Sequence, residues 1–321
     1  MNPQQTRVID PINTEVVRGF KQAMFIAMYL FPAVPVRQYG GTVIEFGKES
    51  FRKLSTRRAR GGATGRVRFG YEGKPYALTH HSLEGQVAYE DMVDASQVPG
   101  IDLSRGATNL AMRLLALQHE SAAAEIALDA ARYDDNHKLA LAGADKWSSP
   151  DSDPQADIKA GKAAVRRSTG VDPNVLTLAP DVYDALTEHP KLKERIKYTS
   201  RESIDEAILA QLLGVGKVVV GRAIYAPEGD AANDFVDVWG NAAVLAYVPA
   251  GGDGGYAPSG DGQILSKEEP AYGYTYVMNG MPVVEQPYQD RNTKSWVYPT
   301  TYDATPVISG ISAGFLFQNP S

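Results

Sequence analysis

Residues 102–133 read DLSRGATNLAMRLLALQHESAAAEIALDAARY, and this stretch decides much of the fold. Asp102 and Ser104 stand at its start, and their side-chain oxygens can accept hydrogen bonds from the free amides of a first helical turn. Apolar or small residues then recur four and three positions apart, which is the spacing that lines one helix face. They are Leu110, Leu114, Leu117, Ser121, Ala124, Leu128 and Ala131. The pattern predicts one helix that ends near Tyr133 and is about 45 Å long.

The segment before this helix predicts a long two-stranded hairpin. Residues 42–46 (TVIEF) and 66–71 (RVRFGY) alternate apolar and polar side chains, and the glycine-rich stretch 61–65 (GGATG) lies between them. Period-two alternation on both sides of a glycine-rich tip is typical of paired strands. Two strands alone lack a hydrophobic core, so we expect this hairpin to lie on another surface, which includes the surface of a second subunit.

The hairpin also carries an unusual charge. The chain of 321 residues has 32 Lys and Arg against 38 Asp and Glu, a net charge of −6. Residues 50–71 contain seven cations and no acidic residue, so removing these charges leaves −13 on the other 299 residues. The seven are Arg52, Lys53, Arg57, Arg58, Arg60, Arg66 and Arg68. Such an asymmetry indicates an anionic partner for this segment.

Two kinds of anionic partner fit the basic segment. Nucleic acid would require cations on one face together with exposed aromatic rings, and here the aromatic residues Phe51, Phe69 and Tyr71 lie at the ends of the segment. Arginine also forms two-pronged contacts with carboxylates. Because the rest of the chain is acidic, we favour ion pairing with another copy of the same chain.

The remaining segments predict a mixture of helices and strands. Residues 1–36 predict an extended arm with a short helix between Thr14 and Leu30. Residues 155–250 predict a compact α/β unit, with a basic turn at 191–195 and a helix capped by Ser203 and Glu206. Residues 271–321 return to strands, and Asn279-Gly280 predicts a hairpin turn between 272–278 and 281–285. Residues 143–157 predict a linker or a domain edge.

Several classes of protein and site are excluded or disfavoured. The absence of cysteine excludes disulfides, thiolate metal sites and cysteine nucleophiles. The longest apolar stretch, residues 23–34, is too short to span a membrane, which requires roughly 20 residues. His80 and His81 are adjacent and would point to opposite faces of a strand, so we expect no shared metal ion, and we expect no cofactor. His119 is expected at the surface or in an interface.

None of the sequence motifs considered indicates an enzyme. No Gly-x-Ser-x-Gly elbow occurs, and Gly214-Val-Gly216-Lys217 lacks the remaining residues of a phosphate-binding loop. The glycine-rich residues 251–262 lack the ladder of oxygen ligands that calcium loops use. We therefore expect a protein that is not an enzyme.

The order of the predicted elements resembles that of the tailed-bacteriophage major capsid proteins, which have the Hong Kong 97-type capsid fold. The resemblance covers essentially the whole chain and rests on element order more than on any short motif. The matching stretches are LFPAVPV at 30–36, residues 76–94 with Glu90-Asp91, LLGVGKVVVGRAIY at 212–225, YGYTY at 272–276, and residues 307–319 with GFLF at 314–317.

This resemblance implies an α+β fold in four parts. Residues 1–36 would form an N-terminal arm and 37–77 an extended loop. Residues 78–150 and 266–321 would form a peripheral domain with the long helix as its spine, and 151–265 an inserted axial domain. The implied function is structural: pentamers and hexamers of the subunit would close into an icosahedral shell that encloses double-stranded DNA.

The resemblance also implies partners and a location. The partners would be other copies of the chain, a portal, decoration proteins, and DNA on the inner face, with no membrane. Since the chain starts close to the arm, a separate scaffold protein is expected. The location would be the virion, after synthesis in the host cytoplasm. Some family members crosslink Lys to Asn, and Lys53 with Asn279 or Asn292 would be the candidates here.

Two other functions remain open from the sequence. An encapsulin-like compartment would share the fold and hold cargo enzymes in place of DNA. A nucleic-acid-binding protein acting through residues 52–68 would bind DNA as a monomer, with an affinity that falls as salt rises.

Overall fold

The computed structural model describes residues 9–19, 24–45, 57, 72–97, 102–196, 204–227, 235–249 and 271–321. The N-terminal segment forms α1 (Pro11–Arg18), α2 (Ala27–Leu30) and β1 (Ala33–Val36). Helix α1 starts at Asp10, whose carboxylate accepts hydrogen bonds from the amides of Ile12 and Asn13. The predicted helix between Thr14 and Leu30 is therefore two short helices.

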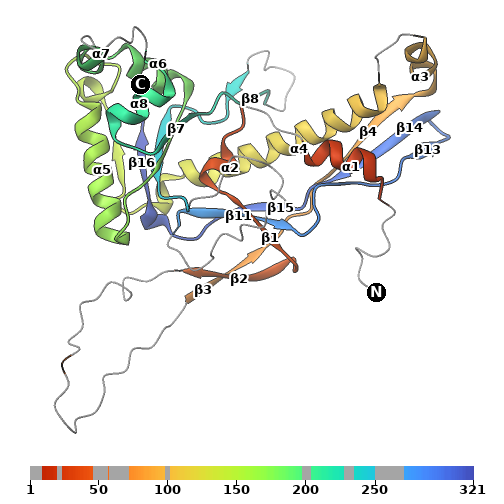
Figure 1. The fold of residues 1–321 in the computed structure, drawn as a ribbon, viewed down its shortest axis with the longest axis horizontal. Coiled ribbons are helices and arrows are strands. Elements are labelled where there is room, and N and C mark those ends of the chain that lie inside the picture. The colour runs from red at the N-terminus through yellow and green to blue at the C-terminus, as the bar shows by residue number, and fades with distance from the viewer. Residues whose placement is uncertain are drawn as a thin grey trace.

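The segment after β1 forms the predicted hairpin. Strands β2 (Gly40–Glu45) and β3 (Glu72–Ala77) pair in antiparallel register, with Gly41 opposite Tyr76. This two-stranded ribbon leaves the body of the molecule on the side opposite α2 (Figure 1). The pairing confirms the base of the hairpin, whereas residues 46 and 66–71 of the predicted strands lie outside the described residues.

The long helix α4 (Leu103–Leu128) is the spine of the molecule (Figure 1). Asp102 caps its first turn by accepting from the amide of Arg105, as the sequence predicts. The helix ends at Leu128, earlier than predicted, because Asp129 takes an extended conformation and caps a short 3-10 turn, η3 (Ala130–Arg132). Helix α3 (Tyr89–Ser96) lies close to the start of α4 in the same view.

Two sheets run along this spine. One has the order β1-β11-β15, in which β11 (Gly273–Met278) pairs in parallel with β1 and antiparallel with β15 (Ala304–Ile308). In the other, β14 (Ser295–Thr301) pairs antiparallel with three strands. These are β4 (Ser82–Ala88), β12 (Val283–Val284) and β13 (Tyr288–Asp290).

The hairpin predicted at Asn279-Gly280 is wrong. The turn itself forms, with Gly280 at φ +89 and the amide of Met281 donating to the carbonyl of Met278. The strands on its two sides then enter different sheets, since β11 pairs with β1 and β15 and β12 pairs with β14. The turn residues set a local reversal of the chain, but the partners of each strand come from elsewhere.

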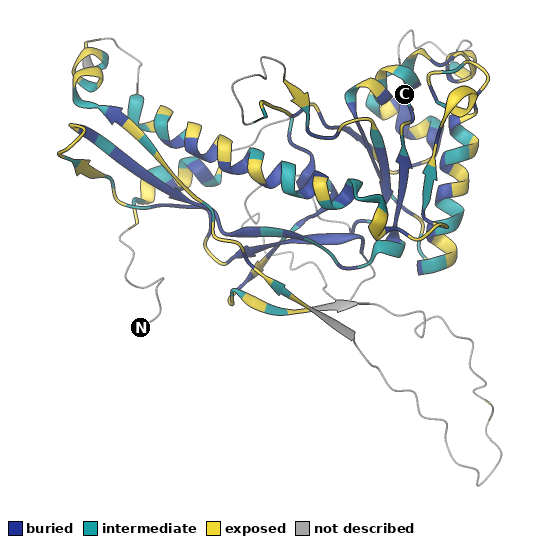
Figure 2. Cartoon of the chain, turned by 180° about the vertical axis from the view of Figure 1, so that it is seen from behind, coloured by how far each residue is buried: buried dark blue, intermediate teal, exposed yellow. Residues whose placement is uncertain are grey.

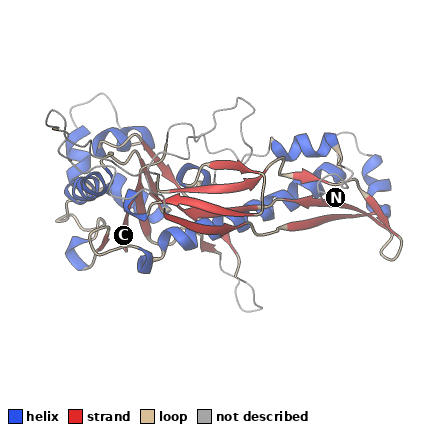
Figure 3. Ribbon diagram, turned by 90° about the horizontal axis from the view of Figure 1, so that it is seen from below, coloured by secondary structure: helices blue, strands red, loops and turns tan. Residues whose placement is uncertain are grey.

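A third sheet, with the order β5-β16-β10-β6-β7, forms the end of the molecule around which the remaining helices gather (Figure 3). Its strands are β5 (Lys138–Ala140), β6 (Val175–Leu178), β7 (Lys217–Val220), β10 (Ala242–Ala246) and β16 (Gly314–Gln318). The helices are α5 (Pro154–Thr169), α6 (Pro180–Glu188), α7 (Pro190–Ile196) and α8 (Glu206–Leu213). Short elements complete the order: η4 (Gly143–Asp145), β8 (Ile224–Tyr225), β9 (Val236–Asp237) and η5 (Ile311–Ala313).

Three local predictions in this region are corrected. Residues 191–195 belong to helix α7 and do not form a turn. Helix α8 is capped by Asp205, which accepts from the amide of Ile208, and Ser203 lies outside the described residues. Residues 143–157 are packed: Trp147 is fully buried against Phe317, and its amide donates to the carbonyl of Pro320.

The hydrophobic core extends through all three sheets. Buried residues line both the spine and the five-stranded sheet, whereas exposed residues dominate the described part of the ribbon (Figure 2). Strand β16, which the proposed division places in the peripheral domain together with its neighbour β5, pairs with β10 of the proposed axial domain, and β6 and β7 follow in the same sheet. One continuous sheet therefore contains strands from both proposed domains.

Candidate assembly surfaces

The basic segment predicted to contact a partner lies mostly outside the described residues. Arg57 is described, and it is exposed. The other six predicted site residues are outside: Arg52, Lys53, Arg58, Arg60, Arg66 and Arg68. What the structure does describe is the ribbon that leads to and from this segment.

The ribbon is fixed to the body by aromatic packing. The Tyr76 ring stacks on Tyr276 of β11, with ring centroids 4.4 Å apart and planes 10° apart. Burial raises the pKa of Tyr276 to about 12, with a smaller contribution from Tyr76. Gly41 faces the Tyr76 ring across the ribbon, and a Cβ at this position would lie 2.7 Å from a ring carbon. Glycine is therefore required there for the ring to lie across the strand pair.

A polar contact fixes the two ends of the ribbon. Tyr39, just before β2, donates its hydroxyl to Asp303 Oδ2 at 3.1 Å, and His80, after β3, places Nδ1 3.3 Å from the same oxygen. The Tyr39 and His80 rings lie 4.5 Å apart. Asp303 stands between β14 and β15 and is fully buried. His80, which was considered as a metal ligand, is thus paired with a carboxyl group of the body.

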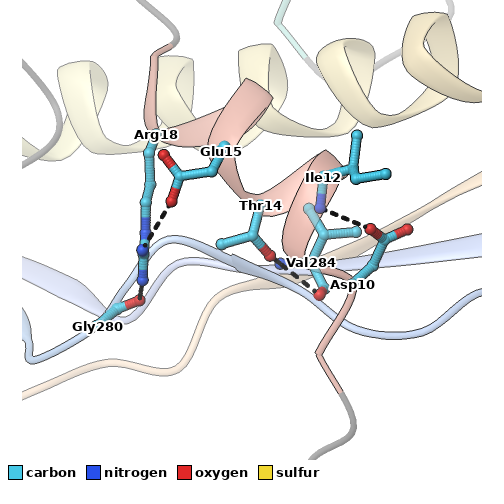
Figure 4. Close-up of polar contacts among 7 residues, drawn as sticks. All are labelled: Asp10, Ile12, Thr14, Glu15, Arg18, Gly280 and Val284. Atoms are coloured by element: carbon cyan, nitrogen blue, oxygen red, sulfur yellow. Dashed lines mark hydrogen bonds and ion pairs between the residues drawn. The ribbon is translucent and has the colours of Figure 1, made fainter.

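The N-terminal helix is attached to an edge strand of the body (Figure 4). Thr14 and Val284 of β12 exchange hydrogen bonds, since the Val284 amide donates to Thr14 Oγ1 at 3.1 Å and Thr14 Oγ1 donates to the Val284 carbonyl at 3.3 Å. Arg18 bonds the carbonyl of Gly280 at 2.6 Å and Glu15 at 3.2 Å. The amide of Asp10 donates to the Val284 carbonyl, so α1 covers the backbone of an edge strand that is otherwise open to pairing.

The buried carboxyl group of Glu120 joins the arm, the spine and the turn that precedes β10 of the third sheet. Glu120 of α4 is fully buried and accepts from the amides of Ile26 and Ala27 at 2.8 and 2.9 Å, at the start of α2. Its Oε1 also accepts from Trp239 Nε1 at 2.7 Å. Three donors from two distant segments thus converge on one side chain, which compensates for its burial.

His119 is also buried, which corrects the expectation of a surface position. Its Nε2 lies 3.1 Å from Thr275 Oγ1, whose hydroxyl donates to the Phe31 carbonyl. Because that hydroxyl proton is already used, Nε2 is the donor of its own hydrogen bond. Burial, with a smaller contribution from His81, lowers the pKa of His119 to about 3. The ring is therefore neutral at pH 7.

The outer face of α4 carries two of the leucines whose spacing predicted the helix. Leu110 and Leu114 are 57% and 47% exposed, whereas the buried face contains Met112, Leu115 and small residues. Leu114, Leu83 and Tyr225 line an open groove of about 900 Å³ between α4, the start of β4 and β8. Exposed apolar side chains gathered in this way are typical of surfaces that contact other proteins.

Sequence reasoning missed Glu120 as a structural residue. The available signal was its position, since Glu120 lies one helical turn from Ala116 and Ala124, on a face of small residues that allow close packing. Among the described residues, no three His, Asp or Glu side chains gather in a way that would hold a metal ion. None of the described helices is both long and apolar enough to cross a membrane.

The projecting ribbon, the attached arm and the spine helix place this chain among structural proteins of capsid type, and comparisons with known proteins agree. The family model for phage major capsid protein E matches residues 132–253. The major capsid protein of Burkholderia phage BcepMu is 32% identical over 313 residues, which cover 97% of this chain and 96% of the relative. The chain therefore belongs to the family of phage major capsid proteins.

Two solved structures extend this comparison. A phage-related protein from Bordetella bronchiseptica RB50 is 46% identical and covers 98% of both chains, with a TM-score of 0.80. The virus-like particle from Pyrococcus furiosus is 13% identical, covers 95% of this chain and 96% of the other, and has a TM-score of 0.54. This second likeness concerns the fold alone. The family is a class of structural virion components and is not an enzyme class.

Proposed function

We propose that this chain assembles through pentamers and hexamers into an icosahedral shell that encloses double-stranded DNA. The observation that carries the proposal is the β2–β3 ribbon, which projects from the body, has few buried residues in its described part and leads into a segment with seven cations. A ribbon of two strands cannot supply its own core, and a surface on a second copy would cover it.

Charge supports a second copy as the partner of this segment. The remainder of the chain carries −13, and exposed acidic residues on α3, Glu90, Asp91 and Asp94, belong to its surface. Arginine forks form strong contacts with carboxylates when water is excluded from them. In this proposal the arm is residues 1–36, the loop 37–77, the peripheral domain 78–150 with 266–321, and the axial domain 151–265.

The proposal includes further partners. A separate scaffold protein, a portal and decoration proteins would complete the particle, which would be built from subunits made in the host cytoplasm. A crosslink from Lys53 to Asn279 or Asn292 is not part of the proposal, because ion pairing of Lys53 requires no such chemistry. Asn279 is in the turn after β11 and Asn292 in the turn after β13.

Charge reversal at the basic segment tests the proposal. Replacing Arg57, Arg58 and Arg60 by Glu is expected to abolish shells and leave the subunit folded, because exposed charges contribute little to its stability. The matched control replaces the same three residues by Lys and is expected to retain assembly. Sedimentation and electron microscopy measure assembly, and circular dichroism measures folding. Normal shells from the Glu variant would contradict the proposal.

The same particles distinguish the two other functions. Nucleic acid in mature particles raises absorbance at 260 nm relative to 280 nm, whereas an encapsulin-like compartment filled with enzymes has a protein spectrum. If the chain is instead a nucleic-acid-binding protein that acts through residues 52–68, it would bind DNA as a monomer, with an affinity that weakens as salt increases. A monomer that binds DNA and forms no shells would replace the capsid proposal with this third function.

A further inference from the structure

Both ends of the projecting ribbon reach one buried carboxyl group. Tyr39 lies just before β2 and His80 lies just after β3, and both contact Oδ2 of Asp303, at 3.1 and 3.3 Å. The amide of Leu78 also donates to the carbonyl of Tyr39 at 2.7 Å, which joins the two ends of the ribbon to each other. The two chain segments and the body therefore meet at a single point.

The burial of the Asp303 side chain makes its contacts with the ribbon energetically important. Its side chain is fully buried, whereas the His80 side chain is 67% exposed. In the described part of the chain, the other oxygen, Oδ1, has no hydrogen-bond partner. Tyr39 thus donates a hydrogen bond to this carboxyl group from one end of the ribbon, and the ring nitrogen of His80 lies near it at the other end. Because a buried polar group without a partner is unfavourable, the body holds the ribbon ends in place.

Further contacts restrict rotation of the ribbon about this point. The amide of Thr79 donates to Thr305 Oγ1 of β15 at 2.9 Å, and the amide of Asn279 donates to the carbonyl of Val36 at 2.8 Å. Tyr76 of β3 also stacks on Tyr276 of β11. The ribbon is therefore attached at several places within a few residues of Asp303.

We infer that Asp303, Tyr39 and His80 form a positioning latch that sets the direction in which the ribbon leaves the body. The latch is a property of the single subunit. Its consequence, that it places the basic segment for contact with a neighbouring copy, rests on the proposed function. The three are positioning residues, since they act through the ribbon and not through contact with the partner.

The absence of cysteine allows a direct measurement of ribbon direction. Spin labels on Thr42→Cys in β2 and Ala160→Cys in α5, both exposed positions, report the distance between ribbon and body in the unassembled subunit. Pulsed electron paramagnetic resonance is expected to give a narrow distance distribution for the parent chain. Combining His80→Ala with Tyr39→Phe is expected to broaden that distribution at least twofold.

Two control variants separate the latch from a general loss of side chains. His80→Asn places an amide donor where Nδ1 lies and is expected to restore the narrow distribution. His81→Ala removes the neighbouring imidazole, which is not part of the Asp303 contact, and is expected to leave the distribution unchanged. An unchanged mean and width in the variant with both His80→Ala and Tyr39→Phe would overturn the latch.

Assembly measured on the same variants separates this inference from the proposed function. A broadened distribution together with reduced shell formation supports both. A broadened distribution with normal shells supports the latch and contradicts the role of the ribbon in assembly. An unchanged distribution overturns the latch whether or not shells form.

Discussion

The five-stranded sheet and the β2–β3 ribbon differ in how much of their surface is buried within the subunit. Every residue of β6 is buried, as are most residues of β7, β10 and β16, and helices gather around this sheet. The ribbon pairs two strands with no helix against them in the described residues, and it is attached to the body only near its root. The sheet is stable through its own core, whereas the described part of the ribbon is mostly exposed. In the proposed function, a second copy of the chain covers the ribbon.

This difference makes a general prediction: substitutions in the body change the free energy of unfolding of the subunit, and substitutions in the ribbon change assembly. Four specific tests follow from it, each measured on the unassembled subunit by urea unfolding.

The largest effect is expected at Glu120. Glu120→Gln places an NH₂ group against one of the amide donors that the carboxylate accepts from. The facing amide and the new NH₂ group are then both left without an acceptor, and each buried donor left in this way lowers the free energy of unfolding by about 1–3 kcal/mol. Trp239→Phe removes one donor and is expected to cost less. If Glu120→Gln has wild-type stability, the arm and the third sheet are not joined through this side chain.

A pair of adjacent leucines tests which face of the spine helix is buried. Leu115 is 4% exposed and Leu114 is 47% exposed. Leu115→Ala is expected to lower the free energy of unfolding by about 2–5 kcal/mol through the cavity that it leaves. Leu114→Ala, the matched control, should change it by no more than about 0.5 kcal/mol. Equal losses would contradict the burial of Leu115 and the exposure of Leu114.

The third test concerns how the free energy of unfolding changes at acid pH. The pKa of His119 is lowered to about 3 in the folded subunit by burial, while an unfolded histidine has a pKa of about 6.5. The unfolded state alone therefore binds this proton between those values, and the stability present above pH 6.5 falls as the pH decreases toward 3. Between pH 7 and pH 5 this group accounts for a loss of about 2 kcal/mol.

A variant isolates this contribution. His119→Gln keeps an amide donor for Thr275 and has no proton to gain, so the acid loss of stability should be smaller by about 2 kcal/mol between pH 7 and pH 5. Unfolding curves at the two pH values measure it. The same acid loss in both proteins would show that other groups carry the pH dependence.

The smallest effect on the subunit is expected at the root of the ribbon. Tyr76→Leu removes the stack on Tyr276 and should lower the free energy of unfolding by about 0.5–1.5 kcal/mol. Its effect on shell formation should be larger than its effect on unfolding, because the ring helps to hold the ribbon. The comparison between body and ribbon fails if Tyr76→Leu destabilises the subunit as much as Leu115→Ala.

Local features of the spine helix were predictable from the sequence. The cap at Asp102 and the continuous helix through Leu128 follow from capping chemistry and spacing, which depend on neighbours a few residues away. The face on which the predicted apolar residues lie is buried only in part. Small residues such as Ala111, Ala116 and Ala123 are buried, whereas Leu110 and Leu114 are exposed. Apolar spacing alone does not distinguish these two faces.

The candidate surfaces were predictable only in part. The paired strands at the base of the ribbon were expected from alternation, and the exposed Arg57 belongs to the segment selected by charge. That a second copy of the chain contacts this segment stays a prediction. Glu120 had a signal only in its position on a face of small residues, and the hydrogen-bond partners of Glu120 and Asp303 could not be predicted, because they are contributed by residues far away in the chain.

The sequence by itself determined the order of most elements, the cap at Asp102, the turn at Asn279-Gly280 and the separation of a basic segment from an acidic remainder. These depend on interactions over a few residues or on composition. Only the tertiary structure decided which strands pair across the turn at Asn279, which face of the spine is buried, and that Glu120 and His119 lie inside. These outcomes depend on burial and on hydrogen-bond partners contributed by distant segments, and a polar side chain is buried only where such partners are present.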